Sequence, residues 1–306
     1  MSVALRSRRG AEVFDMVADA DQLDEVYRVF AEHLQLPSDQ SWRELVRKRG
    51  IPKSVRERMP PLLCSLPPYD KDDRILSRRL ADDLRRRFPK DVLARVPELA
   101  IRRGGGLLIL NSQRGARHLE PWHDEHGRIV ALRGYHPGTD NKYKTTAGRT
   151  GPKLHFAYGV PRSEIADCPW LFTEAWMKAE VAAHALGCVA VAFAGVQGPT
   201  SWERALAVKR EIAPDAPSYV AFDAEVWTTK PHIAKQAFTL AKLVRWREGR
   251  LAGFACWETP ITKGAPAQKG IDDAIAAGLD MQLLDWHGFA PVMDRAFKRW
   301  RSRVAA

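Results

Sequence analysis

The 306-residue sequence contains few cysteines, and their placement excludes one common kind of metal site. The four of them, Cys64, Cys168, Cys188 and Cys256, are far apart, and no two form a Cys-x-x-Cys pair. Structural zinc sites in proteins are built from closely spaced Cys and His ligands. We therefore expect no zinc module, and we interpret the cysteines as buried thiols in a reducing compartment.

Long apolar segments and nucleotide-binding loops are also missing. No apolar run approaches the roughly 18 residues that predict a membrane-spanning helix. The opening stretch, MSVALRSRRGAEVF, has no apolar core of about 7–15 residues of the kind found in signal peptides. We expect a cytoplasmic protein with no membrane partner. The sequence has no Gly-x-x-x-x-Gly-Lys-Ser/Thr motif, so it is not expected to act as its own replicative helicase.

Acidic residues are outnumbered, with 37 Asp and Glu against 48 Lys and Arg and a net charge of +11. Such an excess favours a polyanionic partner, because basic side chains gain affinity by releasing counterions from phosphates. A generally basic proteome is the alternative explanation. The basic residues gather between positions 78 and 103, at Arg78, Arg79, Arg85, Arg86, Arg87, Lys90, Arg95, Arg102 and Arg103.

The N-terminal region shows helical patterns. After a loose arm of about 18 residues, apolar side chains recur at three- and four-residue steps over 21–36, which predicts a helix. A capping-box pattern, Ser41 to Glu44, predicts a second helix over 41–49, and a third is expected over 51–59. The three form either a helix-turn-helix reader or, as we prefer, a small helical subdomain. A fourth helix, 73–88, carries arginines that are either solvated or directed at phosphates.

Two further motifs admit two interpretations each. The glycines at 104–106 either let a backbone approach a phosphate or, as we prefer, form a tight turn before a strand. A hairpin is expected from strands 118–122 and 129–132, joined by a polar turn over 124–127. The residues His118, His123, Asp124 and His126 around it suggest either a metal site or, as we prefer, an ordinary solvated turn.

From residue 171 onward, apolar strands alternate with helices. The strands are expected at 171–173, 189–194, 219–222 and 251–256, with helices at 176–186, 201–211, 231–247 and 272–277 between and after them. This alternation predicts an α/β fold with a mainly parallel sheet that is flanked by helices. A last helix is expected over 291–304.

Carboxylates follow three of these strands. Glu174, the pair Asp223 and Glu225, and the pair Asp272 and Asp273 stand where a strand leads toward a helix. Divalent ions such as Mg²⁺ prefer oxygen ligands, and two ions roughly 4 Å apart support phosphoryl transfer. Taken singly, Glu174 is also explained as a charge at a helix N-terminus and Asp272 as an N-cap.

The order of short motifs resembles a known family. The sequence has Gly127-Arg-Ile-Val130, Asn141-Lys-Tyr-Lys144 and His155-Phe-Ala-Tyr-Gly159, then Glu174, Asp223-Ala-Glu225 and Lys269-Gly-Ile-Asp272. This series resembles the Toprim-containing core of DnaG-type primases over residues 100–280, and looks closest to the compact primases of phages and mobile elements. Three positions depart from the family pattern: Ala175 stands for Gly, Glu225 for Asp, and Gly270 for an acidic residue.

The resemblance implies a Toprim-like parallel sheet with an N-terminal helical and α+β basic subdomain. The expected divisions are a helical basic region (1–99), an α+β basic subdomain (100–168), a Toprim-like catalytic domain (169–283) and a C-terminal helix (284–306). It also implies a DNA primase-like nucleotidyltransferase that makes primers from NTPs on single-stranded DNA with Mg²⁺ or Mn²⁺, beside a separate helicase. A Toprim nuclease and a non-catalytic nucleic-acid-binding protein are the alternatives.

The resemblance further implies roles for individual residues. The expected catalytic residues are Glu174, Asp223 and Glu225. The expected metal ligands are Glu174, Asp223, Glu225, Asp272 and Asp273. The residues expected to bind nucleic acid or NTP are Arg133, Lys142, Lys144, Lys178 and Lys269.

Overall fold

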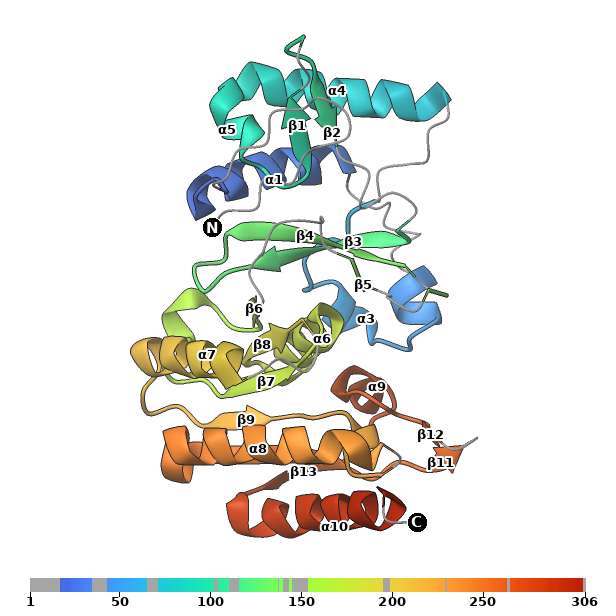
Figure 1. The fold of residues 1–306 in the computed structure, drawn as a ribbon, viewed down its shortest axis with the longest axis vertical. Coiled ribbons are helices and arrows are strands. Elements are labelled where there is room, and N and C mark those ends of the chain that lie inside the picture. The colour runs from blue at the N-terminus through green and yellow to red at the C-terminus, as the bar shows by residue number, and fades with distance from the viewer. Residues whose placement is uncertain are drawn as a thin grey trace. The chain divides into compact units, whose positions relative to one another are not determined.

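The structure, a computed structural model, describes residues 17–34, 43–64, 71–101, 104–109, 116–136, 138–139, 143–144, 154–194, 199–228, 230–262 and 265–304. The chain divides into two compact units. Unit 1 comprises Met1–Ser38 and Pro61–Pro152, and unit 2 comprises Asp39–Pro60 and Lys153–Ala306. Figure 1 labels their helices and strands.

Unit 2 is built on a six-stranded sheet in the order β13-β10-β9-β7-β8-β6. Its four central strands, β7 (Trp170–Glu174), β8 (Val189–Phe193), β9 (Ser218–Val220) and β10 (Ala252–Trp257), run parallel to one another. The edge strands β6 (Leu154–Tyr158) and β13 (Met281–Leu284) are antiparallel. The expected mainly parallel sheet is confirmed, with an antiparallel strand added at each edge.

The order of the strands reverses direction at β7. The chain passes from β7 through α6 (Trp176–Leu186) to β8 on one side, then through α7 (Pro199–Ile212) to β9 on the other side. Because β-α-β crossovers are right-handed, this reversal places α6 and α7 on opposite faces of the sheet. Helix α8 (Pro231–Glu248) packs against α7 and α10 (Trp286–Val304), and α9 (Ile271–Ala276) packs against α6.

Aromatic side chains fill the space between the sheet and its helices. Trp202 of α7 stacks on Phe193 of β8 with 4.2 Å between ring centroids, and Phe289 of α10 stacks on Phe254 of β10 at 4.1 Å. All four side chains are buried, and burial of large apolar area is the main stabilising term for such a core. The central strands are covered on both faces, which explains why their sequences are continuous apolar runs rather than alternating ones.

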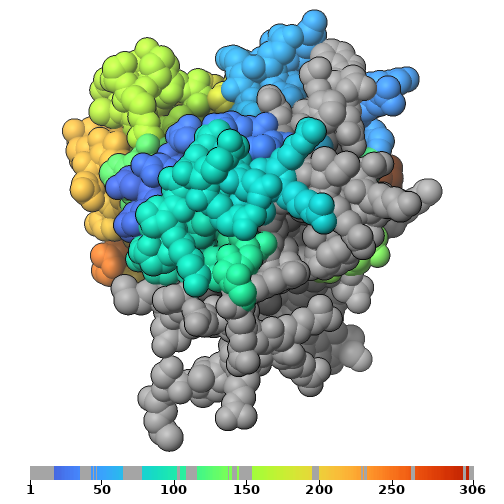
Figure 2. All heavy atoms as spheres, turned by 90° about the horizontal axis from the view of Figure 1, so that it is seen from above, coloured from blue at the N-terminus to red at the C-terminus, as the bar shows by residue number. Residues whose placement is uncertain are grey.

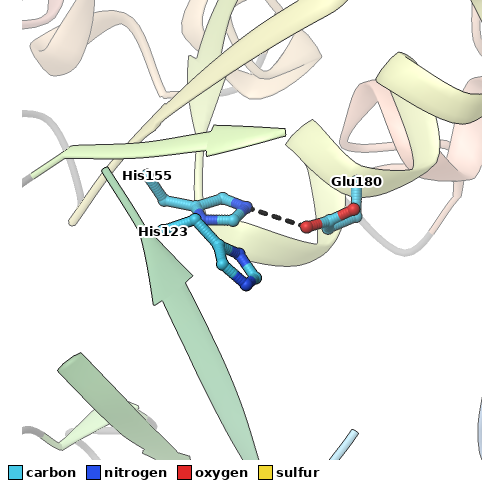
Figure 3. Close-up of side chains that lie close together, drawn as sticks. All are labelled: His123, His155 and Glu180. Carbon is cyan, nitrogen blue, oxygen red and sulfur yellow. Dashed lines mark hydrogen bonds and ion pairs between the residues drawn. The ribbon is translucent and has the colours of Figure 1, made fainter. Parts of the chain in front are cut away.

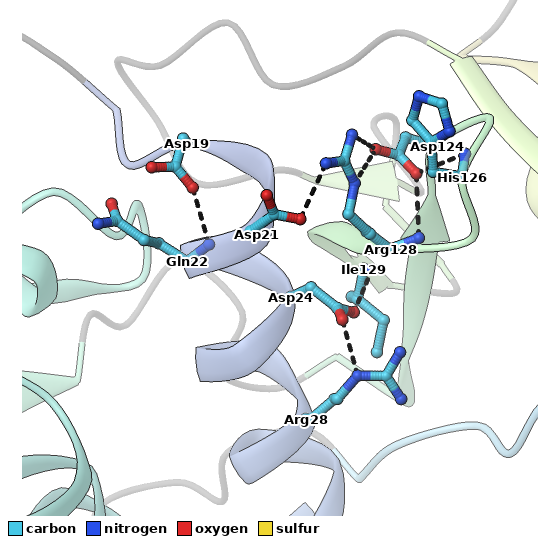
Figure 4. Close-up of polar contacts among 9 residues, drawn as sticks. All are labelled: Asp19, Asp21, Gln22, Asp24, Arg28, Asp124, His126, Arg128 and Ile129. Atoms are coloured by element: carbon cyan, nitrogen blue, oxygen red, sulfur yellow. Dashed lines mark hydrogen bonds and ion pairs between the residues drawn. The ribbon is translucent and has the colours of Figure 1, made fainter.

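Unit 1 combines helices with two small antiparallel sheets. Its elements are α1 (Ala20–Leu34), α4 (Lys71–Arg87), α5 (Lys90–Ala94), the hairpin β1–β2 (Leu99–Ile101, Leu107–Ile109) and the sheet β3-β4-β5 (His118–His123, Ile129–Tyr135, Tyr143–Lys144). The apolar face of α1 is buried and packs on β4. Figure 4 shows how α1 is tied to the start of β4: Asp24 accepts a 2.7 Å hydrogen bond from the Ile129 amide, and Arg128 pairs with Asp21 at 2.9 Å.

The polar turn before β4 is held by its own hydrogen bonds, but the solvated turn preferred from the sequence is wrong in part, because His118 and Asp124 are buried. Asp124 accepts hydrogen bonds from the His126 amide (2.9 Å) and the Arg128 amide (3.0 Å), and it pairs with the Arg128 side chain (Figure 4). Gly127 adopts a φ of 77°, a left-handed conformation that glycine reaches without strain. These bonds occupy the Asp124 carboxylate within the turn itself.

The N-terminal helices belong to different units, so both the three-helix reader and the preferred small subdomain built from all three are wrong. Helix α1 belongs to unit 1, whereas the segment with α3 (Lys53–Arg56) belongs to unit 2. The helix expected over 41–49 is a five-residue π-helical turn, Arg43–Arg47, and Ser41 lies outside the described residues. The glycines at 104–106 lie in the β1–β2 connection, which agrees with the turn interpretation.

The last helix begins five residues earlier than expected, because Asp285 caps it at that point. Asp285 accepts hydrogen bonds from the amides of Gly288 (2.9 Å, side chain) and Phe289 (2.9 Å, backbone), so the helix starts at Trp286 and Pro291 lies inside it. Three of the four cysteines are buried and Cys64 is partly exposed. Burial raises the pKa of the Cys256 thiol to about 12, so it stays protonated. No helix in the described part of the chain is long and apolar enough to cross a membrane.

Candidate active site

The carboxyl ends of β7, β9 and β10 form the edge at which the predicted carboxylates gather. In the chain, β8 separates β7 from β9, but in the sheet β7, β9 and β10 are direct neighbours. The chain leaves β7 toward β8 and leaves β9 toward β10, so the switch point lies between β7 and β9, and such a point is where ligands bind in open α/β sheets. We call the set Glu174, Asp223, Glu225 and Asp272 the acidic rim.

Backbone hydrogen bonds hold the loops of the acidic rim together. The Ala224 amide, between the two rim carboxylates of the β9 loop, donates to the Lys269 carbonyl at 2.9 Å. The β9 strand is joined to β7 by the Ala221 amide, which donates to the Phe172 carbonyl at 2.9 Å. The loops after β7, β9 and β10 therefore form one connected edge within unit 2.

Lysines pair with the two rim carboxylates of the β9 loop. Lys178 Nζ donates to Asp223 Oδ1 in a short contact, and Lys269 Nζ lies 4.0 Å from Asp223 Oδ2. Glu225 Oε2 is 2.7 Å from Lys230 Nζ and 2.9 Å from Lys269 Nζ. Burial alone raises the pKa of Glu225, but hydrogen bonds from Lys230 and Lys269 outweigh it, so that its pKa lies below the ordinary value.

The other two rim carboxylates are less well compensated. Among the described residues, the Glu174 side chain has no hydrogen bond or ion pair, and Asp272 Oδ1 is buried without a hydrogen-bond partner. Asp272 Oδ2 lies 3.6 Å from Arg49. Burial raises the pKa of Glu174, and burial together with the neighbouring Asp273 raises the pKa of Asp272. Both carboxylates therefore favour bound protons or an added cation.

Asp273 and Asp272 differ in role. Asp273 Oδ2 accepts a hydrogen bond from the Gly270 amide at 3.3 Å and so closes the first turn of α9. Asp272 does not cap this helix, because the N-cap is Gly270, and the interpretation of Asp272 as an N-cap is wrong. No three rim carboxylates, all of which are described, have oxygen atoms within 4.8 Å of one another.

The cations predicted to bind nucleic acid fall into three groups. Lys178 and Lys269 lie on the acidic rim in unit 2. In unit 1, Arg133 of β4 lies between two rings, 5.2 Å from the Trp122 centroid and 4.9 Å from that of Tyr143, and burial lowers its pKa. Lys144 is the last residue of β5. Lys142 lies outside the described residues.

The sequence does not reveal the part that three residues beside the acidic rim play in it. Arg49 and Lys230 each pair with a rim carboxylate, and neither belongs to a motif that could have identified it. At Gly270 the sequence indicates only a missing carboxylate. A Cβ on Gly270 would come within 2.4 Å of Asp272 Oδ1 and 2.6 Å of Lys178 Cε, so any other residue here would push these two side chains away.

A second buried polar group lies on the same helix as Lys178. A 3.0 Å hydrogen bond joins His155 of β6 to Glu180 of α6, as Figure 3 shows, and His184 Nε2 lies 3.2 Å from the other Glu180 oxygen. All three side chains are in unit 2 and buried. The group compensates the buried Glu180 charge and fixes α6, which carries Lys178, against the edge strand β6.

Comparison with known proteins identifies the fold. No protein-family model matches the sequence, and no match is found among curated proteins. Solved structures do match. A DnaG primase catalytic domain bound to single-stranded DNA is 15% identical, with a TM-score of 0.51 over 90% of this chain and 80% of that chain. The RNA polymerase domain of Mycobacterium tuberculosis DnaG is 15% identical, with a TM-score of 0.56 over 85% and 83%.

A DNA primase domain from Pseudomonas aeruginosa also matches, at 16% identity and a TM-score of 0.51 over 84% of this chain and 75% of that chain. At these identities the likeness shows the fold. The chain has the fold of the DnaG-type primase catalytic core, and the resemblance inferred from motif order is confirmed at that level.

Proposed function

We propose that this chain, which has the fold of the DnaG primase catalytic core, is a DNA primase-like nucleotidyltransferase. It would make short primers from NTPs on single-stranded DNA. The observation that carries the proposal is the acidic rim: four carboxylates at the ends of three neighbouring parallel strands or in the segments that follow them, at the switch point of the sheet. In-line phosphoryl transfer needs carboxylates from separate loops, because one loop cannot surround the ions that neutralise the phosphates.

The residues of the rim fit a hard divalent ion, Mg²⁺ or Mn²⁺, in their chemistry. They offer oxygen donors, and one of these, Asp272 Oδ1, is buried and without a partner among the described residues. We assign Asp223, Glu225 and Asp272 as metal ligands, and Glu174 as a ligand or a group that moves a proton. When bound, the ion supplies positive charge to the reacting phosphates. Asp273, which closes the first turn of α9, serves mainly to position Asp272.

The cations complete the proposed site. Lys269 on the rim is 45% exposed, so its ammonium can turn from Glu225 toward a triphosphate without leaving a buried position. Lys144 and Lys142 of unit 1 are proposed to hold template phosphates. Arg133 fits stacking with bases or rings better than a bidentate phosphate contact, because its Nε is buried. A separate helicase, and an origin in a phage or mobile element, remain part of the proposal.

Incubation of the full chain with labelled NTPs and single-stranded DNA tests the proposal. We expect short labelled primers that require Mg²⁺ or Mn²⁺. Asp223→Ala should reduce synthesis by roughly 100-fold or more, because it removes a carboxylate that acts on the reacting phosphates. Asp215→Ala is the matched control: Asp215 is exposed and precedes the amino end of the same strand, so synthesis should not change.

The same assay separates the alternatives. Shortened template without primers would indicate a nuclease that uses the same rim with water as the nucleophile. Binding of template with neither product would indicate a non-catalytic nucleic-acid-binding protein. Primer synthesis in excess chelator, or undiminished synthesis by Asp223→Ala, would contradict the metal-dependent rim.

A further inference from the structure

Lys178 is the most deeply buried of the rim lysines. It stands in the first turn of α6, four residues after Glu174, and its Nζ donates to Asp223 Oδ1. Its side chain is 15% exposed, against 43% for Lys230 and 45% for Lys269. The lysine therefore places a positive charge inside the rim rather than at its margin.

The stem of Lys178 is fixed by the loop that carries Asp272. At Gly270, the position of a Cβ would be 2.6 Å from Lys178 Cε and 3.2 Å from Lys178 Cδ, and 2.4 Å from Asp272 Oδ1. The lysine stem and the aspartate oxygen thus both lie against the backbone of Gly270, where a larger residue would have to displace them. Lys178 therefore contacts Asp223, which follows β9, and lies beside Asp272 of α9. Glu174 ends β7, the strand that leads to the helix of Lys178.

The ammonium of Lys178 lies among the carboxylates of the acidic rim. Its Nζ contacts Asp223 Oδ1, and both its stem and Asp272 Oδ1 lie against Gly270. The buried carboxylates of Asp223 and Asp272 and the half-buried one of Glu174 repel one another unless cations lie among them, and in a two-ion site the metal ions perform that task. The fixed ammonium performs part of it in this chain.

We propose that Lys178 takes the place of one divalent ion, so that the rim binds a single Mg²⁺ or Mn²⁺ ion instead of two. This inference rests on the proposed function for the presence of a metal-binding rim. Asp223 Oδ1 is occupied by the lysine, which leaves the Asp272 Oδ1 and Glu174 oxygens as the donors without a partner among the described residues. The lysine supplies a permanent charge of +1 at a fixed position, and the single ion supplies the rest.

Counting Mn²⁺ ions by the electron paramagnetic resonance signal of the free ion tests the proposal on the full chain. We expect one Mn²⁺ per wild-type chain and two per Lys178→Met chain, since methionine keeps an unbranched stem above Gly270 and removes the charge. Lys230→Met is the matched control. It removes an exposed lysine from Glu225, so its count should stay at one.

Thermal unfolding shows whether the variant is folded when its ions are counted. In chelator, Lys178→Met should melt below wild type, because its buried carboxylates lose their counter-charge. Addition of Mn²⁺ should raise the melting temperature of Lys178→Met more than that of the wild type, since each bound ion stabilises the folded state. If the variant does not fold, the number of Mn²⁺ ions bound by the wild type decides the question. A wild type that binds no ion, or two ions, overturns the proposal. An unchanged count of one in folded Lys178→Met also overturns it.

Primer synthesis by the same preparations separates this inference from the proposed function. Primers made by a wild-type chain that binds two ions would contradict the inference and leave the function standing. If the wild type binds one ion and Lys178→Met binds two, but no primers are made, the result would support the inference and contradict the proposed function.

Discussion

Ala175 adopts a φ of 62° and a ψ of 147° between β7 and α6, a conformation that is essentially restricted to glycine. Strain of this kind costs about 1–3 kcal/mol and is often found at functional sites. It lies directly after Glu174, where the chain must turn from strand to helix while it presents the carboxylate at the edge. The alanine that departs from the family pattern is thus a strained residue.

We expect Ala175→Gly to stabilise the chain by about 1 kcal/mol, since relief of strain exceeds the greater entropy of glycine in the unfolded chain. Urea unfolding of both proteins measures the difference. Ala185→Gly, in the same helix with ordinary helical backbone, should instead destabilise by about 1 kcal/mol. Equal destabilisation by the two substitutions would show that residue 175 is not strained.

The rim carboxylates should respond to pH with opposite signs. The pKa of Glu174 is raised in the folded state, so its contribution to stability is present below its ordinary value of 4.5 and is lost as pH rises through the folded value. The pKa of Glu225 is lowered, so its contribution is present above 4.5 and is lost as pH falls through the folded value. The two side chains differ in this way because only Glu225 is paired with lysines.

In chelator at about pH 7, Glu174→Gln should therefore raise the melting temperature and Glu225→Gln should lower it. Both differences should shrink as the pH falls toward about 4, because both carboxylates then take up protons in the wild type. Melting curves of the three proteins across this pH range measure the effect. If both substitutions changed the melting temperature in the same direction at neutral pH, the conclusion that lysines compensate Glu225 but not Glu174 would be contradicted.

At the scale of an element, α4 shows which basic residues are available to a polyanion. Its described arginines are exposed, and Figure 2 shows part of this helix on the surface of unit 1. Arg85 pairs with Asp82, Arg86 with Asp83 at 3.2 Å, and Arg87 with Glu32 at 2.9 Å. Arg78 and Arg79 have no such partner among the described residues.

We expect the double substitution of Arg78 and Arg79 by Ala to weaken binding of single-stranded DNA more than that of Arg85 and Arg86. For each phosphate that the variant no longer neutralises, the slope of log affinity against log salt should become shallower by about 0.7. Fluorescence anisotropy with a labelled oligonucleotide between about 50 and 200 mM salt gives that slope. Equal effects of the two double substitutions, or a wild-type affinity that does not change with salt, would contradict phosphate binding by α4.

At the scale of the whole molecule, the two units do not follow the order of the chain. The segment Asp39–Pro60 is separated in sequence from the rest of unit 2, yet it belongs to that unit. It brings Arg49 to Asp272, and Ala276 Cβ lies 3.7 Å from the Cβ position of Gly50. Removal of the N-terminal region as a separable module would therefore also remove a side chain that pairs with the rim. The division into four consecutive domains remains a prediction.

Local chemistry allowed much of unit 2 to be predicted from the sequence. The helix over 176–186 has the predicted bounds, and each predicted strand from 171 onward is present within three residues at either end. Helix and strand periods are properties of neighbouring residues, so they can be recognised without knowledge of the fold. The placement of carboxylates after strands is equally local, because the strand end and the acidic residue are only a few positions apart.

Other features depended on the tertiary structure. Strand order put β7 rather than β8 beside β9, and so brought together three carboxylate-bearing strand ends that are not consecutive in the chain. The edge strand β13 has no alternating pattern, and its pairing with β10 decides that it is a strand. Lys230 and Arg49 appear in the sequence as ordinary basic residues, and Lys178 appears only as a residue expected to bind nucleic acid or NTP. Only packing that joins distant segments brings each of them to a carboxylate, because a charge is compensated by what lies near it in space and not by what precedes it in the chain.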